Sequence, residues 1–379
     1  MSLARRARNF ANALRLLFRL APSLLLLVAS GANPEDATDI GRSSVACANV
    51  DYGRTRLGVG GDPETTPNPR GPTLVSIGVF VRQLSALDVV QGQYMFRGHV
   101  RSTWCDPRLA FDATEAGTDE KVYVATAAER ELAGIWYPAG FPVNRAGGLE
   151  LTERILQVAA DGTVHSDLNI GVPLHASFDL RRFPFDRQKL ALEVESVRWQ
   201  IDEMVLVEDE MVTGFSADLS MPEWEIMSVG ERIEQADGVR DTRPFSRLLF
   251  EIELRRRPGF YLWKVLLPIF IIVAISWSVF WMTDENVASR TRITATGVLT
   301  VVAYQFVVAE DLPRIAYLTV LDKLMLLSFG LLAVTVVQSL WVGRLQASDF
   351  AKAKRLDRMS RWIFPLGYAV LVATLIVTA

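Results

Sequence analysis

RRFPFDRQKL, residues 181–190, places two aromatic side chains around a proline, sets an aspartate directly after them and flanks the group with basic residues. Phe183, Pro184 and Phe185 form a compact apolar group, and Pro184 stiffens the turn at its centre. A group of this kind needs an apolar surface to pack against. The composition of the rest of the chain indicates where that surface lies.

The C-terminal third of the 379-residue chain is markedly apolar. It carries four long apolar runs, at 265–281, 293–308, 315–342 and 362–379. Each approaches the ~20 residues that a helix needs to cross a bilayer. The segment between the last two runs holds six basic residues, so we expect it to be cytoplasmic. The pattern predicts a multi-pass protein of the inner (plasma) membrane, with both ends on the exported side.

The N-terminus has the order of a secretory signal peptide. Residues 1–32 contain five arginines and no acid, then a leucine-rich core too short to span a bilayer, then small residues. An amphipathic surface helix is the alternative. Residues 33–72 are rich in Gly, Pro, Asp and Thr, so we expect a flexible lead-in that contributes no core.

Charge and motif content exclude several classes of protein. Residues 33–250 carry 21 basic against 34 acidic side chains, which argues against a nucleic-acid partner and suits cations or basic small molecules. We find no metal-ligand cluster, no phosphate loop and no nucleophile with its base, so we expect neither an enzyme nor a cofactor. The only cysteines, Cys47 and Cys105, permit one disulfide, but the sequence does not show whether they pair.

Residues 73–257 read as an exported, immunoglobulin-like all-β sandwich. Short alternating or β-branched runs recur between turn signals, and Asp161-Gly162 separates two of them as in a hairpin. The last run, 250–254, leads almost directly into the first apolar run. We therefore expect an all-α, four-helix membrane domain at 258–379, coupled to the sandwich through this short connection.

One stripe at helical spacing marks the second apolar run. Its members are Arg292, Thr296, Leu299, Ala303, Phe306 and Glu310. Charged side chains at both ends of the stripe and a hydroxyl within it would cost free energy if they faced lipid, so we expect the stripe to face water or protein. If several copies surround an axis, these residues line a pore with apolar constrictions at Leu299 and Phe306. An ordinary bundle helix with snorkelling end charges is the alternative.

Several motifs follow one another in a fixed order. They are WCDPRL (104–109), Trp136 and Pro138 with Asn144, DGTV (161–164), FPFD (183–186) with Gln188, RRPGFY (256–261), Pro268, and LPRIAY (312–317). In this order they are similar to the Cys-loop superfamily of pentameric ligand-gated ion channels, from about residue 73 to the C-terminus. The short segment between the last two spans resembles the prokaryotic members. Ala176 and Leu190 occupy the positions of the family's loop cysteines, so no disulfide closes this loop.

The resemblance implies a homopentamer in a lipid bilayer that conducts small inorganic ions and responds to a small-molecule or proton agonist. It also implies that the loop couples the sandwich to the pore, with Asp186 paired to Arg256. The expected coupling residues are Asp88, Phe183, Pro184, Phe185, Asp186, Arg256 and Pro313. A surface loop with an exposed ion pair is the alternative.

The resemblance places a ligand site between subunits. Trp104 matches an aromatic of the complementary side, whereas Val143 and Val197 stand where amine-binding relatives place aromatics. Trp199 and Phe245 are further candidates, although core packing suits Trp199 better. A quaternary amine is therefore not implied.

Ion selectivity depends on the phase of the second span. Arg290 and Arg292 lie about 200° apart on a helix, so only one of them can face the axis. If Arg292 does, a ring of guanidinium groups favours anions. Acidic residues at both mouths favour cations, so a cation-selective channel is one alternative. A narrow ring of unpaired charge would block the pore, so a non-conducting membrane sensor is another.

Overall fold

The computed structural model describes residues 45–50, 52, 62–237, 243–282, 287–309 and 315–378. Two compact units are present, and the first, Met1–Arg42, lies outside the described residues. The expected signal peptide therefore lies outside them, as do Glu310 and Pro313. The second unit, Ser43–Ala379, contains every element that follows.

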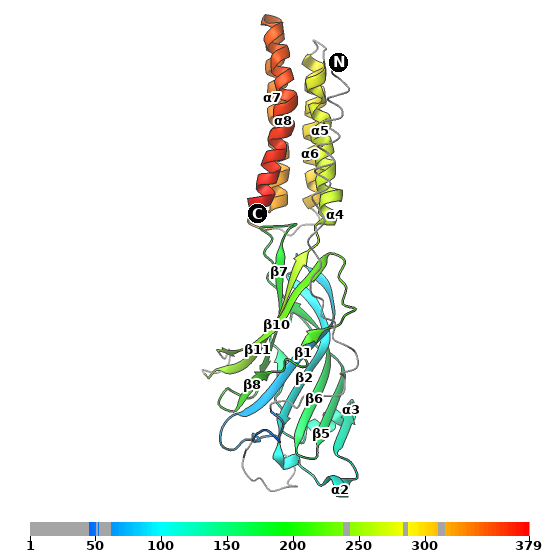
Figure 1. Cartoon of the computed structure of the whole chain (residues 1–379), viewed down its shortest axis with the longest axis vertical. Coiled ribbons are helices and arrows are strands. Elements are labelled where there is room, and N and C mark those ends of the chain that lie inside the picture. The colour runs from blue at the N-terminus through cyan, green and yellow to red at the C-terminus, as the bar shows by residue number, and fades with distance from the viewer. Residues whose placement is uncertain are drawn as a thin grey trace, which may run out of the picture. The chain divides into compact units, whose positions relative to one another are not determined.

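Residues 73–256 form a β-sandwich of two sheets, as the sequence predicts (Figure 1). The larger sheet has the order β3 (Glu120–Val124), β5 (Glu150–Ala159), β6 (Thr163–His175), β2 (Gln93–Cys105), β1 (Thr73–Asp88), β8 (Met204–Glu208), with β9 (Gly214–Phe215) also on β1. The smaller sheet has the order β10 (Trp224–Ala236), β11 (Phe245–Arg256), β7 (Arg187–Ser196), β4 (Gly140–Pro142). Neighbours are antiparallel, except that β8 and β9 run parallel to β1.

Alternation along several strands supplies part of the core. In β7, Leu190, Leu192 and Val194 are buried while the residues between them are more exposed, so one face packs inside the sandwich. The predicted hairpin at Asp161-Gly162 joins β5 to β6, and Gly162 has a φ of +91°, which favours glycine. Short helices η1 (Pro107–Leu109), α2 (Ala113–Ala116) and α3 (Thr126–Leu132) fill the β2–β3 and β3–β4 connections.

The expected lead-in takes part in the fold, which corrects the prediction that it offers no core. Cys47 forms a disulfide with Cys105 at the end of β2. Val45 and Tyr52 are buried, and the Tyr52 hydroxyl accepts a hydrogen bond from the backbone N–H of Leu74. A segment rich in turn residues can still be fixed by a few buried side chains and one covalent bond, which constrains the unfolded chain.

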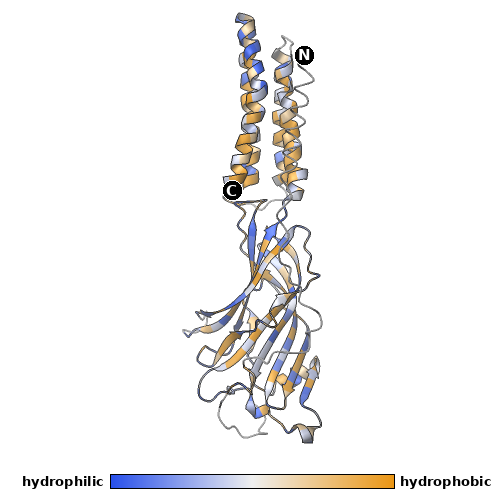
Figure 2. Cartoon of the chain, in the orientation of Figure 1, coloured by the Kyte–Doolittle hydropathy of each residue, from blue (hydrophilic) through white to orange (hydrophobic). Residues whose placement is uncertain are grey.

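The membrane domain contains four helical segments. The first is continuous through α4 (Gly259–Tyr261), the π-helical turn η2 (Leu262–Leu266), α5 (Leu267–Ser276) and the 3₁₀ turn η3 (Trp277–Trp281). The others are α6 (Val287–Ala309), α7 (Val320–Ser348) and α8 (Phe350–Thr378). Within the described residues, three segments are long and apolar enough to cross a membrane: Gly259–Trp281, α7 and α8. Figure 2 shows that apolar residues are frequent along these helices, whereas apolar and polar residues are mixed along the strands of the sandwich.

Two connections in the structure are short, and one of them differs from what the sequence suggests. The basic segment expected as a loop between the last two spans is helical, because α7 continues to Ser348 and α8 begins at Phe350, with Asp349 alone between them. The connection from sandwich to membrane is equally short. Only Arg257 and Pro258 separate the end of β11 from the start of α4.

Candidate functional site

The FPFD loop lies between β6 and β7 and contacts the membrane helices. Phe183, which precedes a cis proline, is 2% exposed, and its ring meets that of Tyr261 edge-on at 4.6 Å. Its carbonyl accepts a hydrogen bond from the backbone N–H of Leu321 at the start of α7. The backbone N–H of Leu180 donates to the hydroxyl of Tyr317 at 3.1 Å. The loop therefore contacts both the first helix and the segment that leads into α7, while Phe185 is only half-buried.

Asp186 and Arg256 form a buried, two-point ion pair. Arg256 Nε lies 2.8 Å from Asp186 Oδ1, and Nη2 lies 3.2 Å from Oδ2. The two side chains are 3% and 1% exposed for Arg256 and Asp186, so the alternative of an exposed surface pair does not describe this structure. The side-chain amide of Gln188 also donates to Asp186 Oδ2, which leaves the carboxylate well satisfied.

Aromatic rings surround the guanidinium of Arg256. Its central carbon lies 4.1 Å from the ring centroid of Trp224, 4.9 Å from that of Phe183 and 5.9 Å from that of Tyr261. Such contacts favour a desolvated cation. A second carboxylate, Glu223, lies 3.8 Å from Nη1. Arg256 thus joins the FPFD loop, strand β10 and the first helix.

Asp88, which we expected to join this pair, has a different role. Its carboxylate accepts hydrogen bonds from the backbone N–H groups of Val90 and Gln91, within the β1–β2 turn. Glu223, rather than Asp88, supplies the further carboxylate beside Arg256. A turn aspartate readily bonds its own backbone, and this local bond competes with a distant partner.

The two faces of α6 differ in exposure. Every described member of the predicted stripe is exposed: Arg292, Thr296, Leu299, Ala303 and Phe306. The other face packs in the bundle, and its buried members are Arg290, Thr294, Gly297, Val301 and Val308. Arg290 and Arg292 therefore point in opposite senses, with Arg292 on the exposed face. Glu310, at the end of the stripe, lies outside the described residues.

Arg290 enters a buried polar network at one end of the bundle. Its Nη2 donates to Asp357 Oδ2 of α8 at 2.6 Å and to the carbonyl of Val279 at 2.9 Å. Gln338 of α7 donates to the other carboxylate oxygen of Asp357 at 3.2 Å. Within the described residues, Arg290 Nε and Nη1 have no hydrogen-bond partner. Asp357 thus neutralises the charge of Arg290, but two of its three guanidinium nitrogens have no partner among the described residues.

Two close contacts join the first helix to α6. Pro268 has no N–H to offer the carbonyl of Lys264, and the hydroxyl of Tyr304 donates to that carbonyl at 2.6 Å. Further along, a Cβ added to Gly297 would lie 2.0 Å from Ser276 Oγ, so a larger residue there would force the serine side chain to move. Sequence reasoning identified Pro268 but not the two α6 residues in these contacts, Tyr304 and Gly297.

The aromatic candidates for the ligand site lie in the core of the subunit, which corrects the expectation for Trp104 and Phe245, whereas core packing was already the better interpretation for Trp199. Trp104 is 0% exposed and stacks edge-on with Trp136, which in turn packs on Trp199. Phe245, at the start of β11, is also buried. Their rings present no open surface for a ligand between subunits. Val143 and Val197 are the two candidates that are exposed.

Proton-sensitive groups are present in the sandwich. Burial lowers the pKa of His99 and that of His165, whose Nδ1 lies 2.9 Å from the hydroxyl of Thr103. Burial raises the pKa of Glu231, although a hydrogen bond from Thr213 opposes that shift. Both histidines therefore stay neutral until the pH falls below the ordinary range of histidine.

Sequence reasoning missed several residues of this site. Gln188, Tyr261 and Tyr317 all belong to the motifs quoted above, so each had a signal without an assigned partner. Trp224 and Asp357 had none, because their partners lie far along the chain.

Comparisons with known proteins agree with this architecture. The family model of the neurotransmitter-gated ion-channel ligand-binding domain matches residues 57–258. The gamma-aminobutyric acid receptor subunit beta-4 of Gallus gallus is 25% identical over 299 residues, 76% of this chain and 59% of the relative. The proton-gated ion channel of Gloeobacter violaceus is 26% identical over 296 residues, 78% of this chain and 80% of the relative. The chain thus spans less than two thirds of the receptor subunits that it matches.

Proposed function

Because this chain belongs to the Cys-loop superfamily of pentameric ligand-gated ion channels, we propose that it forms a homopentamer that passively conducts small inorganic ions across the inner membrane. Membership places it among ion channels rather than enzymes. The single observation that carries the proposal is the exposed stripe of α6. A membrane helix that leaves Arg292, Thr296 and Thr300 uncovered requires water or further copies beside that face.

In a pentamer, the exposed stripe lines the axis and each residue becomes a ring. Arg292 forms a charged ring, Thr296 a hydroxyl ring, and Leu299 and Phe306 form apolar constrictions that close the pore by excluding water. Leu299 is 70% exposed and Phe306 is 72% exposed in the single chain, so both side chains have room to meet their copies.

The pore selects anions in this proposal. Asp357 neutralises Arg290 inside the bundle, so the charge that reaches the axis is that of Arg292. Five guanidinium groups at a narrow ring repel cations and favour anions. The acidic residues 284, 285, 310 and 311 would act in the opposite sense, and they lie outside the described residues.

The FPFD loop transmits the opening signal. Its contacts with Tyr261, Tyr317 and Leu321 reach two membrane segments, and the Asp186–Arg256 pair fixes it to the end of β11. Movement of the sandwich on agonist binding therefore acts on the helices at this point. Val143 and Val197 are the exposed positions that remain for an agonist between subunits, and its chemistry is a small molecule or a proton.

The decisive experiment is the reversal potential of Leu299→Thr channels in a planar bilayer under a several-fold KCl gradient. A hydroxyl at this constriction wets it, so the variant is expected to open without agonist. Reversal near the chloride equilibrium potential supports the proposal, and reversal near that of potassium replaces it with a cation channel. Val298→Thr, off the stripe by one position, is the matched control and should stay closed. If Leu299→Thr conducts nothing, the chain is a sensor rather than a channel.

A further inference from the structure

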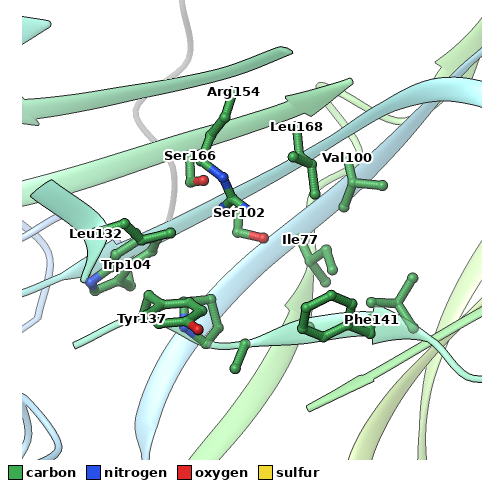
Figure 3. Close-up of a pocket in the computed structure, with 14 residues that line it drawn as sticks. Ile77, Val100, Ser102, Trp104, Leu132, Tyr137, Phe141, Arg154, Ser166 and Leu168 are labelled. Carbon is green, nitrogen blue, oxygen red and sulfur yellow. The ribbon is translucent and has the colours of Figure 1, made fainter. Parts of the chain in front are cut away.

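A pocket opens beside helix α3, between that helix, strands β3 and β5, and the residues that follow η1. We call it the β3–α3 pocket, and its volume is about 220 Å³. Figure 1 shows α2 and α3 at the end of the sandwich opposite to the one where β11 leads into α4. Figure 3 shows a different and smaller cavity, of about 50 Å³, to which Leu132 of α3 contributes. The two cavities share no lining residue, so they are separate sites.

Lys121 brings a positive charge to the β3–α3 pocket. In the β3–β5 register it lies directly opposite Val158, and Tyr123 lies opposite Leu156. Val158 and Leu156 are buried, so the side chain of Lys121 starts on the face of the sheet that packs into the sandwich, although Lys121 itself stays exposed. Its ammonium group lies 4.2 Å from the centroid of the Phe111 ring, and no acidic side chain among the described residues pairs with it.

The other two charged residues of the lining already have partners. Nε and Nη2 of Arg108 each lie 2.8 Å from an oxygen of the Asp106 carboxylate. The Glu131 carboxylate accepts a hydrogen bond from the hydroxyl of Tyr123. Partial burial, together with that carboxylate, raises the pKa of Tyr123, so the hydroxyl stays protonated and keeps donating. Lys121 is therefore the charged group of the lining that remains for a ligand.

Apolar side chains form the rest of the lining. Leu109, Ile135 and Val158 contribute aliphatic surface, and the last two are buried. Phe111 and Tyr123 contribute aromatic rings. A ligand site of this kind combines an apolar surface with a few polar groups that fix the orientation of the ligand. The lining therefore suits a molecule with an apolar body and one anionic group.

The volume of the pocket restricts the size of that molecule. Drug-sized ligands occupy pockets of about 300–1,000 Å³, so the β3–α3 pocket suits a smaller molecule, of about one ring. The rings of Phe111 and Tyr123 favour an aromatic body, since aromatic side chains attract further rings edge-on or offset. We propose that the β3–α3 pocket is a binding site for a single-ring aromatic carboxylate, of which benzoate is the simplest.

In this site the carboxylate accepts a charge-assisted hydrogen bond from the Lys121 ammonium group, and the ring lies against Leu109, Ile135 and Val158. Acetate lacks the apolar body and benzyl alcohol lacks the charge, so both bind more weakly. Benzylamine is rejected, because Lys121 offers it a like charge.

The test measures binding to the full-length protein in detergent by calorimetry, with benzoate titrated at neutral pH and constant ionic strength against a chloride blank. Saturable binding is expected for the natural sequence. Lys121→Met keeps the length of the side chain but removes its charge, and it should weaken binding about tenfold or more. Lys189→Met is the matched control: Lys189 is an exposed lysine on β7 that does not line the pocket, so binding should be unchanged.

A second arm fills the pocket without touching the lysine. Ala110 lines the pocket with an extended backbone, which any residue adopts, so Ala110→Phe should place a ring there and abolish benzoate binding. Thermal unfolding of both variants checks that they fold. Soaking 4-bromobenzoate into crystals of the natural sequence should place an anomalous bromine peak beside Lys121, which locates the ligand without any variant.

Three outcomes overturn the proposal: benzoate does not saturate, Lys121→Met binds it as well as the natural sequence does, or bromine appears only elsewhere. In the first case Lys121 serves only to discourage pairing of other chains with β3, which lies at the edge of its sheet. None of these readouts involves ion flux, so their failure leaves the channel proposal untouched.

Discussion

Two buried arginine–aspartate pairs hold the two functional regions of this molecule, and they differ in how completely they are satisfied. At the membrane end of the sandwich, Arg256 meets both oxygens of Asp186 and lies among three aromatic rings. In the helical bundle, Arg290 uses a single nitrogen for both Asp357 and a carbonyl, and its Nε and Nη1 bond to nothing in the described chain.

The difference indicates what each pair contributes. A buried ion pair gains stability only when its geometry is good and its remaining polar atoms are bonded, so the Arg256 pair is the more stabilising of the two. The Arg290 pair orients α6 and removes one charge from the pore region at some cost in stability. The ion pair at the FPFD loop has its polar atoms bonded, whereas the ion pair on α6, the proposed pore helix, is only partly bonded.

Removal of Asp186 should produce the largest effect. Asp186→Ala leaves Arg256 buried without its carboxylate, and we expect a loss of about 3–5 kcal/mol in the free energy of unfolding, with loss of agonist response. Chemical denaturation of the purified protein measures the first and channel recording the second. Asp179→Ala is the control, because Asp179 lies in the same loop but is exposed. Equal effects from the two variants would contradict the role of the buried pair.

The Arg290 pair should be replaceable where the Arg256 pair is not. Asp357→Asn alone should cost about 2–3 kcal/mol, because the buried charge loses its counter-charge. Arg290→Met combined with Asp357→Leu should recover most of that loss, since the unsatisfied donors disappear together with the charges. The corresponding double replacement of Arg256 and Asp186 should not recover. Denaturation midpoints of these three variants and of Asp186→Ala compare the two pairs directly, and equal recovery in both would remove the distinction.

A smaller effect is expected where α6 meets the first helix. Tyr304→Phe removes the hydroxyl that donates to the Lys264 carbonyl, which Pro268 cannot satisfy, and should cost about 1 kcal/mol. Because this bond joins α6, the proposed pore helix, to the first helix, the variant should also shift the agonist concentration that gives half-maximal current. Tyr317→Phe, which loses a hydroxyl at the coupling loop instead, serves for comparison. An unchanged agonist response in Tyr304→Phe would show that the bond is only structural.

The smallest expected effect is a loss of stability at acid pH, which should concern the sandwich and not the helical bundle. All three histidines, at 99, 165 and 175, lie in the sandwich. The pKa values of His99 and His165 are lowered by burial, so below about 6.5 the unfolded chain binds more protons and stability is lost as the pH falls. Glu231 opposes this, because its raised pKa restores stability as the pH falls through that value. Thermal unfolding at pH 7.5 and 5.5 should show a smaller loss for His165→Gln than for the natural sequence.

Sequence patterns predicted the sandwich, the helical third and the DG hairpin, because each depends on local periodicity or on turn chemistry. Helix geometry also predicted that Arg290 and Arg292 lie on opposite faces of α6, since a rotation of about 200° separates them. The predictions that failed concern how deeply a side chain is buried and which residues meet from distant parts of the sequence. A strand pattern does not tell whether Trp104 faces a neighbouring subunit or the core, and the structure places it in the core.

Long-range partners escaped for a similar reason. Asp357 lies 67 residues from Arg290, and nothing in either local pattern names the other residue. Cys105 lies 58 residues from Cys47, and the sequence permitted their disulfide without showing that the two meet. Tyr52 and Val45 were assigned to a flexible segment because turn-forming residues surround them. Burial of isolated side chains is decided by tertiary packing, which a single sequence does not reveal.

The two residues that join the sandwich to the membrane domain limit how far the two can move apart. From Arg256 to Gly259 the chain covers at most about 11 Å when fully extended. The backbone N–H of Arg257 is also bonded to the carbonyl of Glu223, which removes part of that reach. The connection therefore has almost no mechanical slack: a displacement of the tip of β11 must be taken up by the first turn of the helix, and inserting flexible residues there would let one move while the other stays still.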